Sequence, residues 1–364
     1  MDFTPTEEQA AARDLAARIF GDLATPERLT AAGTDSDPEL WKALCAAGLV
    51  GAVEELGLLG LVLLLEEQGR TTAQVPFAST CVYGLLAVAA HGSPEQRERL
   101  SPGIGDGSVV VCGAFPAQGG VRASAQGELS GVVPVVPWLR DATHVLVADD
   151  RRELWLTPVT DAVRVEAVEL TAPWSAGRLT LDGASAERLG AAGVHLGAQG
   201  EQSLALARPP TPSAYNDVLA TARTAFAGLQ AGVGAGSLAW AVSHVNTREQ
   251  FGRPLATRQG VQLRAADAHM DIEAIRVTAY EAAWRRDAGL PYATHALTAA
   301  WWASEAGQRV VHTGQHLHGG AGADLDHPVH RHFLWGRQLD AYLGGGAEVL
   351  QELGELIVSE EVRP

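Results

Sequence analysis

The sequence predicts an α+β protein in which a small antiparallel β-barrel lies between two helical domains. Apolar residues recur at helical spacing in the first part of the chain, alternate with polar residues in the middle, and return to helical spacing in the last part. These changes of period mark changes of secondary structure, because helices and strands present their side chains with different repeats. We expect an N-terminal all-α domain at 1–107, a middle β-barrel domain at 108–208 and a C-terminal α-helical bundle at 209–364.

The N-terminal region has the apolar stripes and turn signals of several packed helices. Leu15, Ile19 and Leu23 share one helix face. Aspartate, serine, glycine and proline gather at 35–38 and 92–94, and these residues favour turns over helix interiors. The region is therefore predicted to contain separate helices.

The middle region is predicted to consist of short strands joined by turns that contain glycine and proline. Strand candidates with alternating apolar residues lie at 109–111, 144–147, 154–156, 163–165 and 178–181. Short strands at this density are typical of a small barrel. A proline-rich linker at 209–212 ends the region, because consecutive prolines neither join a strand ladder nor continue a helix.

Two long apolar stripes predict the main helices of the C-terminal region. The first runs from Val218 through Phe226 to Trp240, and the second from Ala268 to Ala279. With two shorter helices they predict a four-helix bundle.

Composition and charge exclude several classes of function. Lys and Arg number 27 against 43 Asp and Glu, a net charge of −16 that disfavours nonspecific binding to nucleic acid or to an anionic membrane. The apolar run at 56–65 is too short to span a bilayer. Cys45, Cys81 and Cys112 are odd in number and widely spaced, which argues against a disulfide framework. With no basic, apolar signal segment at the start, we expect a cytoplasmic protein.

The segment 247–262 carries the side chains suited to an extended anionic cofactor. Arg248 offers a planar donor fork that matches phosphate oxygens, and Gln250 and Gln259 can bond to ribose or adenine edges. Phe251 stands beside the glycine of this segment, and the sequence favours equally a core residue and a residue that lines the cofactor site. Arg248 alone could be an ordinary cation at a helix C-terminus, which the helix dipole favours.

A glycine cluster at 316–322 is the second candidate. Gly319 and Gly320 follow two histidines, and paired glycines let backbone amides lie against a nucleotide. The imidazole of His316 can donate to an adenine or ribose acceptor.

These two segments, together with the opening residues 1–9, resemble the acyl-CoA dehydrogenase family, and matching motifs run through nearly the whole chain. The resemblance implies that family's fold and FAD as the cofactor. In homo-oligomeric relatives the matching residues of one subunit contact the FAD whose ring lies in its neighbour. His316 departs from the pattern, since the family has glutamine there. The residues that the resemblance assigns to FAD are Arg248, Gln250, Phe251, Gln259, His316, Gly319 and Gly320.

The chain departs from the family at the catalytic base. Family members use a glutamate after a tyrosine near the C-terminus, where this chain has Tyr342 followed by Leu343. Some relatives carry the glutamate on an earlier helix, at a position that falls at about Ala222 here. Neither leucine nor alanine accepts a proton, so no catalytic residue is assigned.

The segments that hold the flavin ring in the family are also altered. The loop 114–120 and the strand 132–138 lack the family's threonine hydroxyls, and Pro134 and Pro137 remove two backbone donors. The resemblance therefore implies a subunit that has lost its own ring site and completes the FAD site of another chain.

A run of residues at 324–333 further resembles subunits of actinobacterial steroid side-chain degradation, which form α2β2 heterotetramers. By this resemblance the partner is a paralogous acyl-CoA dehydrogenase subunit that carries the catalytic glutamate and binds most of the acyl-CoA. The substrate implied is a steroid side-chain CoA ester. Electrons would pass to an electron-transferring flavoprotein.

Two alternative functions stay open. The chain could be a homo-oligomeric lyase or oxidase on the same scaffold, with Asp340 or Glu348 as its acid, or it could be a flavin-free structural scaffold. A metal site is the rival interpretation of the histidine-rich C-terminal region. We predict no metal, because no cysteine lies nearby and the closest carboxylates stand in a turn. The histidines concerned are His312, His316, His318, His327, His330 and His332.

Overall fold

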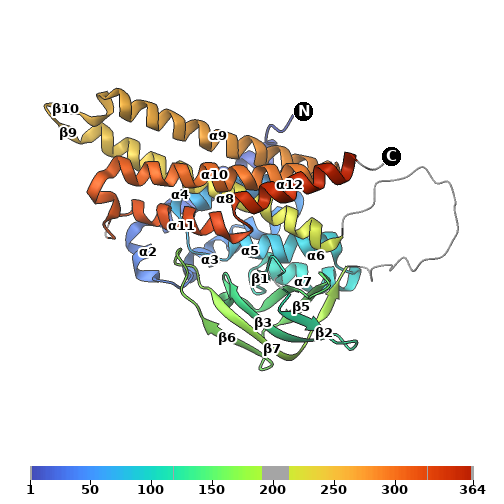
Figure 1. Cartoon of the computed structure of the whole chain (residues 1–364). Coiled ribbons are helices and arrows are strands. Elements are labelled where there is room, and N and C mark those ends of the chain that lie inside the picture. The colour runs from blue at the N-terminus through green and yellow to red at the C-terminus, as the bar shows by residue number, and fades with distance from the viewer. Residues whose placement is uncertain (1, 118, 191–212, 326, 362–364) are drawn as a thin grey trace.

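The computed structural model describes residues 2–117, 119–190, 213–325 and 327–361. Two helical regions pack together, and the strands gather against one side of them (Figure 1). The expected order of helical, sheet and helical domains is confirmed. The exact domain limits stay a prediction, and the limit at 208/209 and the linker at 209–212 lie outside the described residues.

Capping residues and prolines set where the N-terminal helices begin. The Thr6 side chain accepts from the Gln9 backbone N–H, and the Gln9 side chain accepts from the Thr6 N–H, a capping box that starts α1. Three further helices begin with proline in the first turn. The elements are α1 (Glu7–Leu23), α2 (Pro26–Ala32), α3 (Pro38–Ala46), α4 (Leu49–Thr71), α5 (Phe77–Ser79), the π-helix η1 (Thr80–Leu86), α6 (Ala87–His91) and α7 (Pro94–Gly105).

A break in α4 ties this domain to the C-terminal one. Gly57 has φ 72° and interrupts the helix. The carboxylate of Asp287 then accepts the backbone N–H groups of Leu58 and Leu59 at 2.8 and 2.9 Å. This carboxylate, from the last residue of α9, caps the helix that restarts after the break.

The middle domain consists of two four-stranded sheets that enclose an apolar core. One sheet has the order β1-β4-β5-β8 and the other β2-β3-β7-β6. The pairs are antiparallel as predicted, except that β1 and β4 are parallel. The strands are β1 (Val111–Ala114), β2 (Val121–Ala123), β3 (Glu128–Val136), β4 (His144–Ala148), β5 (Leu154–Pro158), β6 (Val163–Ala167), β7 (Gly177–Ser185) and β8 (Glu187–Leu189).

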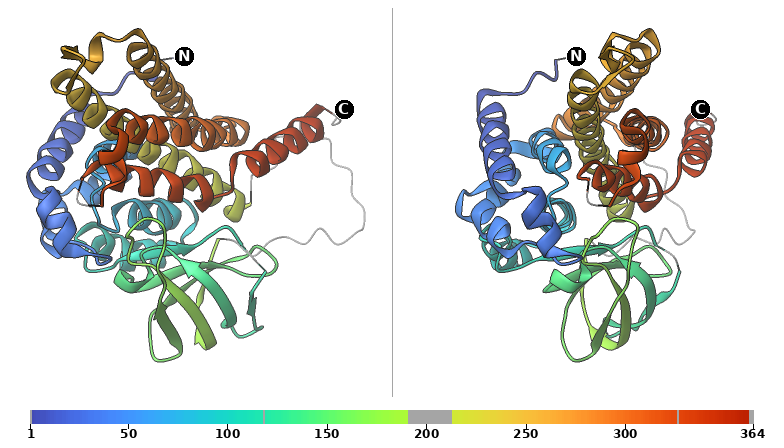
Figure 2. Two further views of the ribbon diagram at one scale, coloured as in Figure 1. Left: turned by 60° about the vertical axis from the view of Figure 1, so that its left-hand side comes forward. Right: turned by 90° about the vertical axis from the view of Figure 1, so that its left-hand side faces the viewer.

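Three long helices form the body of the C-terminal domain, one more than the two stripes predicted. In order, the domain contains α8 (Ala214–Thr247), the hairpin β9 (Glu249–Gln250) and β10 (Arg253–Pro254), the turn η3 (Leu255–Thr257), α9 (Gln259–Asp287), α10 (Ala293–His318), the turn η4 (Gly319–Ala323), α11 (Val329–Tyr342) and α12 (Gly346–Glu361). Helices α8 to α11 form the bundle, and α12 lies outside it against α10 (Figure 2).

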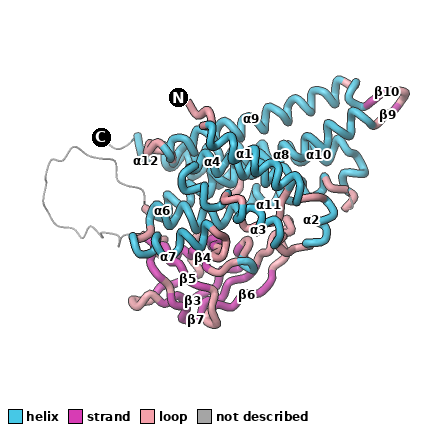
Figure 3. The backbone as a smooth tube through the Cα atoms, turned by 180° about the vertical axis from the view of Figure 1, so that it is seen from behind, coloured by secondary structure: helices cyan, strands magenta, loops and turns pink. Residues whose placement is uncertain are grey.

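Helix α8 is long and apolar enough to cross a membrane by length and composition alone. However, 72% of its most apolar window is buried inside the protein, as expected for the central helix of a bundle. Its neighbours α4, α9 and α10 supply that cover (Figure 3).

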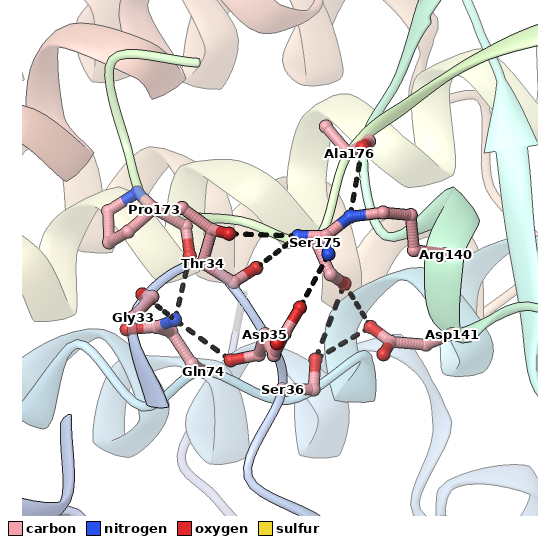
Figure 4. Close-up of polar contacts among 10 residues, drawn as sticks. All are labelled: Gly33, Thr34, Asp35, Ser36, Gln74, Arg140, Asp141, Pro173, Ser175 and Ala176. Carbon is pink, nitrogen blue, oxygen red and sulfur yellow. Dashed lines mark hydrogen bonds and ion pairs between the residues drawn. The ribbon is translucent and has the colours of Figure 1, made fainter. Parts of the chain in front are cut away.

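A polar network joins the N-terminal helices to the sheets (Figure 4). The amide of Gln74 donates to the carbonyls of Asp35 and Pro173 at 3.0 and 2.7 Å. The guanidinium of Arg140, in the turn η2 (Leu139–Asp141), donates to Ala176 O and pairs with Asp35. These bonds fix the position of the sheets relative to the N-terminal helices.

Candidate functional site

A tight hairpin follows α8 at one end of the bundle. Its two turn residues, Phe251 and Gly252, have φ of 54° and 76°, the combination that a type I′ turn requires. Phe251 is 89% exposed, so the core interpretation of this residue is wrong. The guanidinium of Arg258 lies 5.2 Å from the Phe251 ring centroid and donates to Gln250 O at 3.1 Å. Sequence reasoning missed this role of Arg258, which directly precedes Gln259.

Arg248 is the first residue after α8, and its backbone holds the base of the hairpin. Its carbonyl accepts the Leu255 N–H at 2.9 Å. The side chain of Arg248 is exposed, and it forms no ion pair with any residue in the described ranges. The side chain of Gln259, at the start of α9, is also exposed. Both groups are therefore free to meet a ligand or a partner.

The glycine pair lies at the same end of the bundle. Helix α10 ends at His318, and Gly319 has φ 61°. No atom lies within 4 Å of the place where a Cβ would stand on Gly319 or Gly320, so the backbone of this turn is open. His316, one helical turn earlier, is exposed. This open backbone and these exposed donors fit an adenosine diphosphate group.

A small apolar cluster holds the two segments together. Val245 of α8, Leu255 of η3 and Leu317 of α10 pack in one core. The hairpin and the end of α10 therefore lie at one end of the bundle, on the left in Figure 1. The structure thus brings together the sequence segments that were predicted to contact a nucleotide.

The space between the sheets and the bundle is filled with aromatic side chains, which we name the interdomain aromatic cluster. Trp138 stacks on Trp174 with centroids 4.4 Å apart, and Phe115 lies between Tyr83 and Tyr215 at 5.2 and 5.4 Å. All its members are buried, and together they are Tyr83, Phe115, Trp138, Trp174, Tyr215, Phe226, Trp335 and Tyr342.

Both segments that the family resemblance assigned to the flavin ring contribute to this cluster. Phe115 comes from the loop 114–120 and Trp138 from the end of the segment 132–138. Gln118 of that loop lies outside the described residues. The hydroxyls of Tyr83 and Tyr342 bond to each other at 2.9 Å, which further closes the space. The residues present do not fit an isoalloxazine ring at this place.

The two positions where the family places its base are buried and apolar. Leu343 is 6% exposed and Ala222 is 0% exposed. Arg223 donates to the carbonyl of Leu343 and pairs through both terminal nitrogens with Glu352 of α12, at 2.8 and 2.7 Å. The cavity beside Leu343 measures about 20 Å³, room for about one water molecule. An acyl chain does not fit there.

The two acids considered as alternative bases have structural contacts. Asp340 accepts from the Ser304 hydroxyl and pairs with Arg337 at 3.2 Å. Glu348 accepts the Gly345 N–H at 3.3 Å, at the start of α12. Both contacts hold helix ends or neighbouring helices in place.

The histidines of the C-terminal region separate into different environments. His318 and His327 contact each other, and His244 of α8, which the sequence analysis did not single out, stacks on His318. His332 is buried elsewhere, beside the Arg70 carbonyl, and His312 packs on Phe333. Within the described ranges, no group of three or more His, Cys, Asp or Glu side chains has a metal-binding arrangement.

Acid is expected to destabilise the bundle through His332. Burial lowers the pKa of this imidazole from its ordinary 6.5 to about 4. The unfolded chain therefore binds this proton at a higher pH than the folded chain, and stability is lost progressively as the pH falls from 6.5 towards about 4. The thermal unfolding midpoint, measured across this range, should fall more steeply in the native protein than in His332→Gln. Equal slopes would contradict the assignment.

Two family models match the chain. They are the acyl-CoA dehydrogenase N-terminal domain, over residues 6–108, and the acyl-CoA dehydrogenase C-terminal domain, over residues 213–354. Acyl-CoA dehydrogenase FadE27 of Mycobacterium tuberculosis is 32% identical, over 97% of this chain and 98% of its own length. FadE28 of the same organism is 28% identical, over the same shares of the two chains.

Solved structures agree with these matches. A variant of the Tcur3481–Tcur3483 steroid ACAD is 40% identical, with a TM-score of 0.87 over 98% of this chain and 99% of its own. The ChsE4–ChsE5 complex from Mycobacterium tuberculosis is 30% identical, with a TM-score of 0.86 over the same shares. The FAD complex of PigA, 18% identical with a TM-score of 0.83, shares the fold.

Proposed function

The chain belongs to the acyl-CoA dehydrogenase family, and from this premise we propose that it is the base-less subunit of a heteromeric, FAD-dependent acyl-CoA dehydrogenase. Its partner is a paralogous subunit that supplies the catalytic glutamate, the flavin-ring pocket and most of the acyl-CoA site. This chain completes the partner's FAD site with Arg248, Gln250, Phe251, Gln259, His316, Gly319 and Gly320.

One contrast within the molecule supports the proposal. Nucleotide-type contacts are exposed at the hairpin end of the bundle, while the place for a ring and an acyl chain is closed by the interdomain aromatic cluster and Leu343. A subunit that bound the FAD ring itself would need an open space where the interdomain aromatic cluster lies. A subunit that completes a neighbour's FAD site needs only the exposed residues at the hairpin end.

In the assembled enzyme, FAD supplies the hydride acceptor for α,β-dehydrogenation of a CoA thioester. The residues of this chain bind and orient, and they hold no proton in the reaction. Arg248 would place a guanidinium fork at the pyrophosphate, and the amides of Gln250 and Gln259 would bond to ribose or adenine edges. An electron-transferring flavoprotein is the proposed electron acceptor of the complex.

The names of the relatives suggest the substrate and the assembly. One similar structure is a steroid ACAD, and another is a complex of two different subunits. We therefore propose a steroid side-chain CoA ester as the substrate and an α2β2 heterotetramer as the assembly. We also propose a cytoplasmic location, where Cys45, Cys81 and Cys112, all free thiols, stay reduced.

Flavin stoichiometry tests the shared site. The chain is expressed alone and together with a paralogous glutamate-bearing subunit, and native mass and flavin absorbance are measured for each preparation. We expect the lone chain to be colourless and the co-expressed pair to be a yellow heterotetramer with about two flavins, one for each partner subunit. A yellow homotetramer with about four flavins would show that this chain holds a ring itself and would overturn the proposal.

A further inference from the structure

Three histidine rings stack directly behind the open glycine turn. The rings of His244 and His318 stack with centroids 4.7 Å apart and an angle of 29° between their planes, and His327 meets His318 edge to face at 4.8 Å. They come from α8, the last residue of α10 and the segment before α11, so the stack joins three parts of the bundle. We name these residues the histidine stack.

The hydrogen bonds of the stack fix which nitrogens carry protons. His318 Nδ1 lies 2.7 Å from the carbonyl oxygen of Gly314, which can only accept, so Nδ1 is the donor. His318 Nε2 is buried and has no partner in the described part of the chain, and the residue is 5% exposed. His327 Nδ1 accepts the Val329 N–H at 3.2 Å, so the neutral ring carries its proton on Nε2.

The charged groups around the stack make a second proton costly. The positive charge of Arg248, which directly follows α8, lowers the pKa of His244. His330 of α11 lowers the pKa of His327 in the same way. The carboxylate of Asp324 has the opposite effect and raises the pKa of His327. Desolvation, followed by repulsion from the other histidines, lowers the pKa of both His244 and His327. The folded protein therefore favours the neutral forms of His244 and His327.

We propose that His318, held between His244 and His327, is a positioning residue that fixes the Gly319–Gly320 turn for FAD and releases it when the stack takes up a proton. The proposal rests on the proposed function, because it concerns the same FAD site. His318 precedes Gly319 directly, and its bond to Gly314 closes the last turn of α10. Any displacement of this ring moves the turn with it.

The sign of the pH effect follows from the neutral stack. A proton on His327 Nδ1 converts the acceptor of the Val329 N–H into a donor and places a cation beside the His318 ring. Both effects separate the rings. FAD retention should therefore fall as the pH drops below the ordinary histidine value of 6.5.

The test uses the heterotetramer with its bound flavin. Free flavin is measured by fluorescence after ultrafiltration, between about pH 8 and about pH 5. Three stack variants are compared: His327→Phe keeps a ring without a basic nitrogen, His318→Asn keeps a donor towards Gly314 without the ring, and His318→Phe keeps a ring without that donor. His144→Gln is the matched control, because burial also lowers the pKa of His144, in β4, away from the turn.

We expect His327→Phe and His318→Asn to hold less flavin than the native complex at neutral pH, because each removes part of the stack, but to lose roughly tenfold less of it on going from neutral pH to acid. His318→Phe should hold flavin poorly at every pH, and His144→Gln should follow the native profile. Tryptophan fluorescence of the same samples separates flavin release from the unfolding that His332 causes.

Two outcomes would overturn the positioning role while leaving the shared site intact. In one, the profiles of His327→Phe and the native complex coincide. In the other, acid strengthens flavin retention, which would mean that the protonated stack attracts the FAD phosphates instead of releasing the turn. Failure of the proposed function itself has a different signature, because native complex and Arg248→Ala would then hold equal flavin at neutral pH.

Discussion

Replacing Arg248 with alanine is expected to lower the FAD affinity of the heterotetramer by roughly tenfold to a hundredfold, the usual effect of losing hydrogen bonds to a charged group. The side chain is exposed and forms no ion pair with any residue that the structure describes, so its loss leaves no buried charge behind. The fold of this chain should be unaffected. Flavin content per heterotetramer and turnover at limiting FAD measure the effect.

Two further variants make this experiment specific. Arg248→Lys keeps the charge but loses the planar fork, so its affinity should lie between those of the native protein and the alanine variant. Arg122→Ala removes another exposed arginine, from β2 in the sheet domain, and should leave flavin content and turnover unchanged. Normal flavin content and turnover in Arg248→Ala would leave the flavin-free scaffold as the better description of this chain.

Much of the fold followed from the sequence because the period of apolar residues is a local property. The helical stripes of α8 and α9 and the short apolar runs of β4 and β5 are visible in short windows. Helix α10 was not predicted as a long helix, although the buried residues of its Ala293–His318 stretch also recur at helical spacing. The parallel pairing of β1 with β4 depends on the path of the chain, which no local pattern encodes.

In the candidate site, too, some features follow from short sequence segments and others only from the folded chain. Arg248, Gln259 and the glycine pair lie in two short segments whose residue types match a nucleotide, so they could be proposed from the sequence alone, and their role stays a prediction. The interdomain aromatic cluster draws side chains from the N-terminal helices, the sheet domain and the bundle, and only the folded chain brings them together. His244 joined the histidine stack for the same reason, because it lies far from His318 in sequence.

Removing Trp174 is expected to have the largest effect on stability. The side chain is 1% exposed, stacks on Trp138 at 4.4 Å, and meets Trp335 and Tyr342 edge on. Replacing a buried large aromatic residue by alanine costs about 3–5 kcal/mol, because apolar burial is lost and a cavity is left. The indole N–H has no partner in the described part of the chain, so no hydrogen bond is lost with it. The midpoint of denaturant unfolding measures the change.

The same variant asks whether the cluster only fills space or also replaces a ring site. If the closed space were a flavin site blocked by one side chain, Trp174→Ala would bind additional flavin, and the heterotetramer would contain more than about two flavins. We expect no gain, since Phe115 and Trp138 still occupy the ring-facing segments and no hydroxyl of the family's pattern stands there. Trp301→Ala, at a partly exposed tryptophan of α10, is the control and should cost far less stability. The Trp174 variant should therefore lose stability while its flavin stoichiometry stays unchanged. A loss of stability together with a gain of flavin would contradict the division of the FAD site between two subunits.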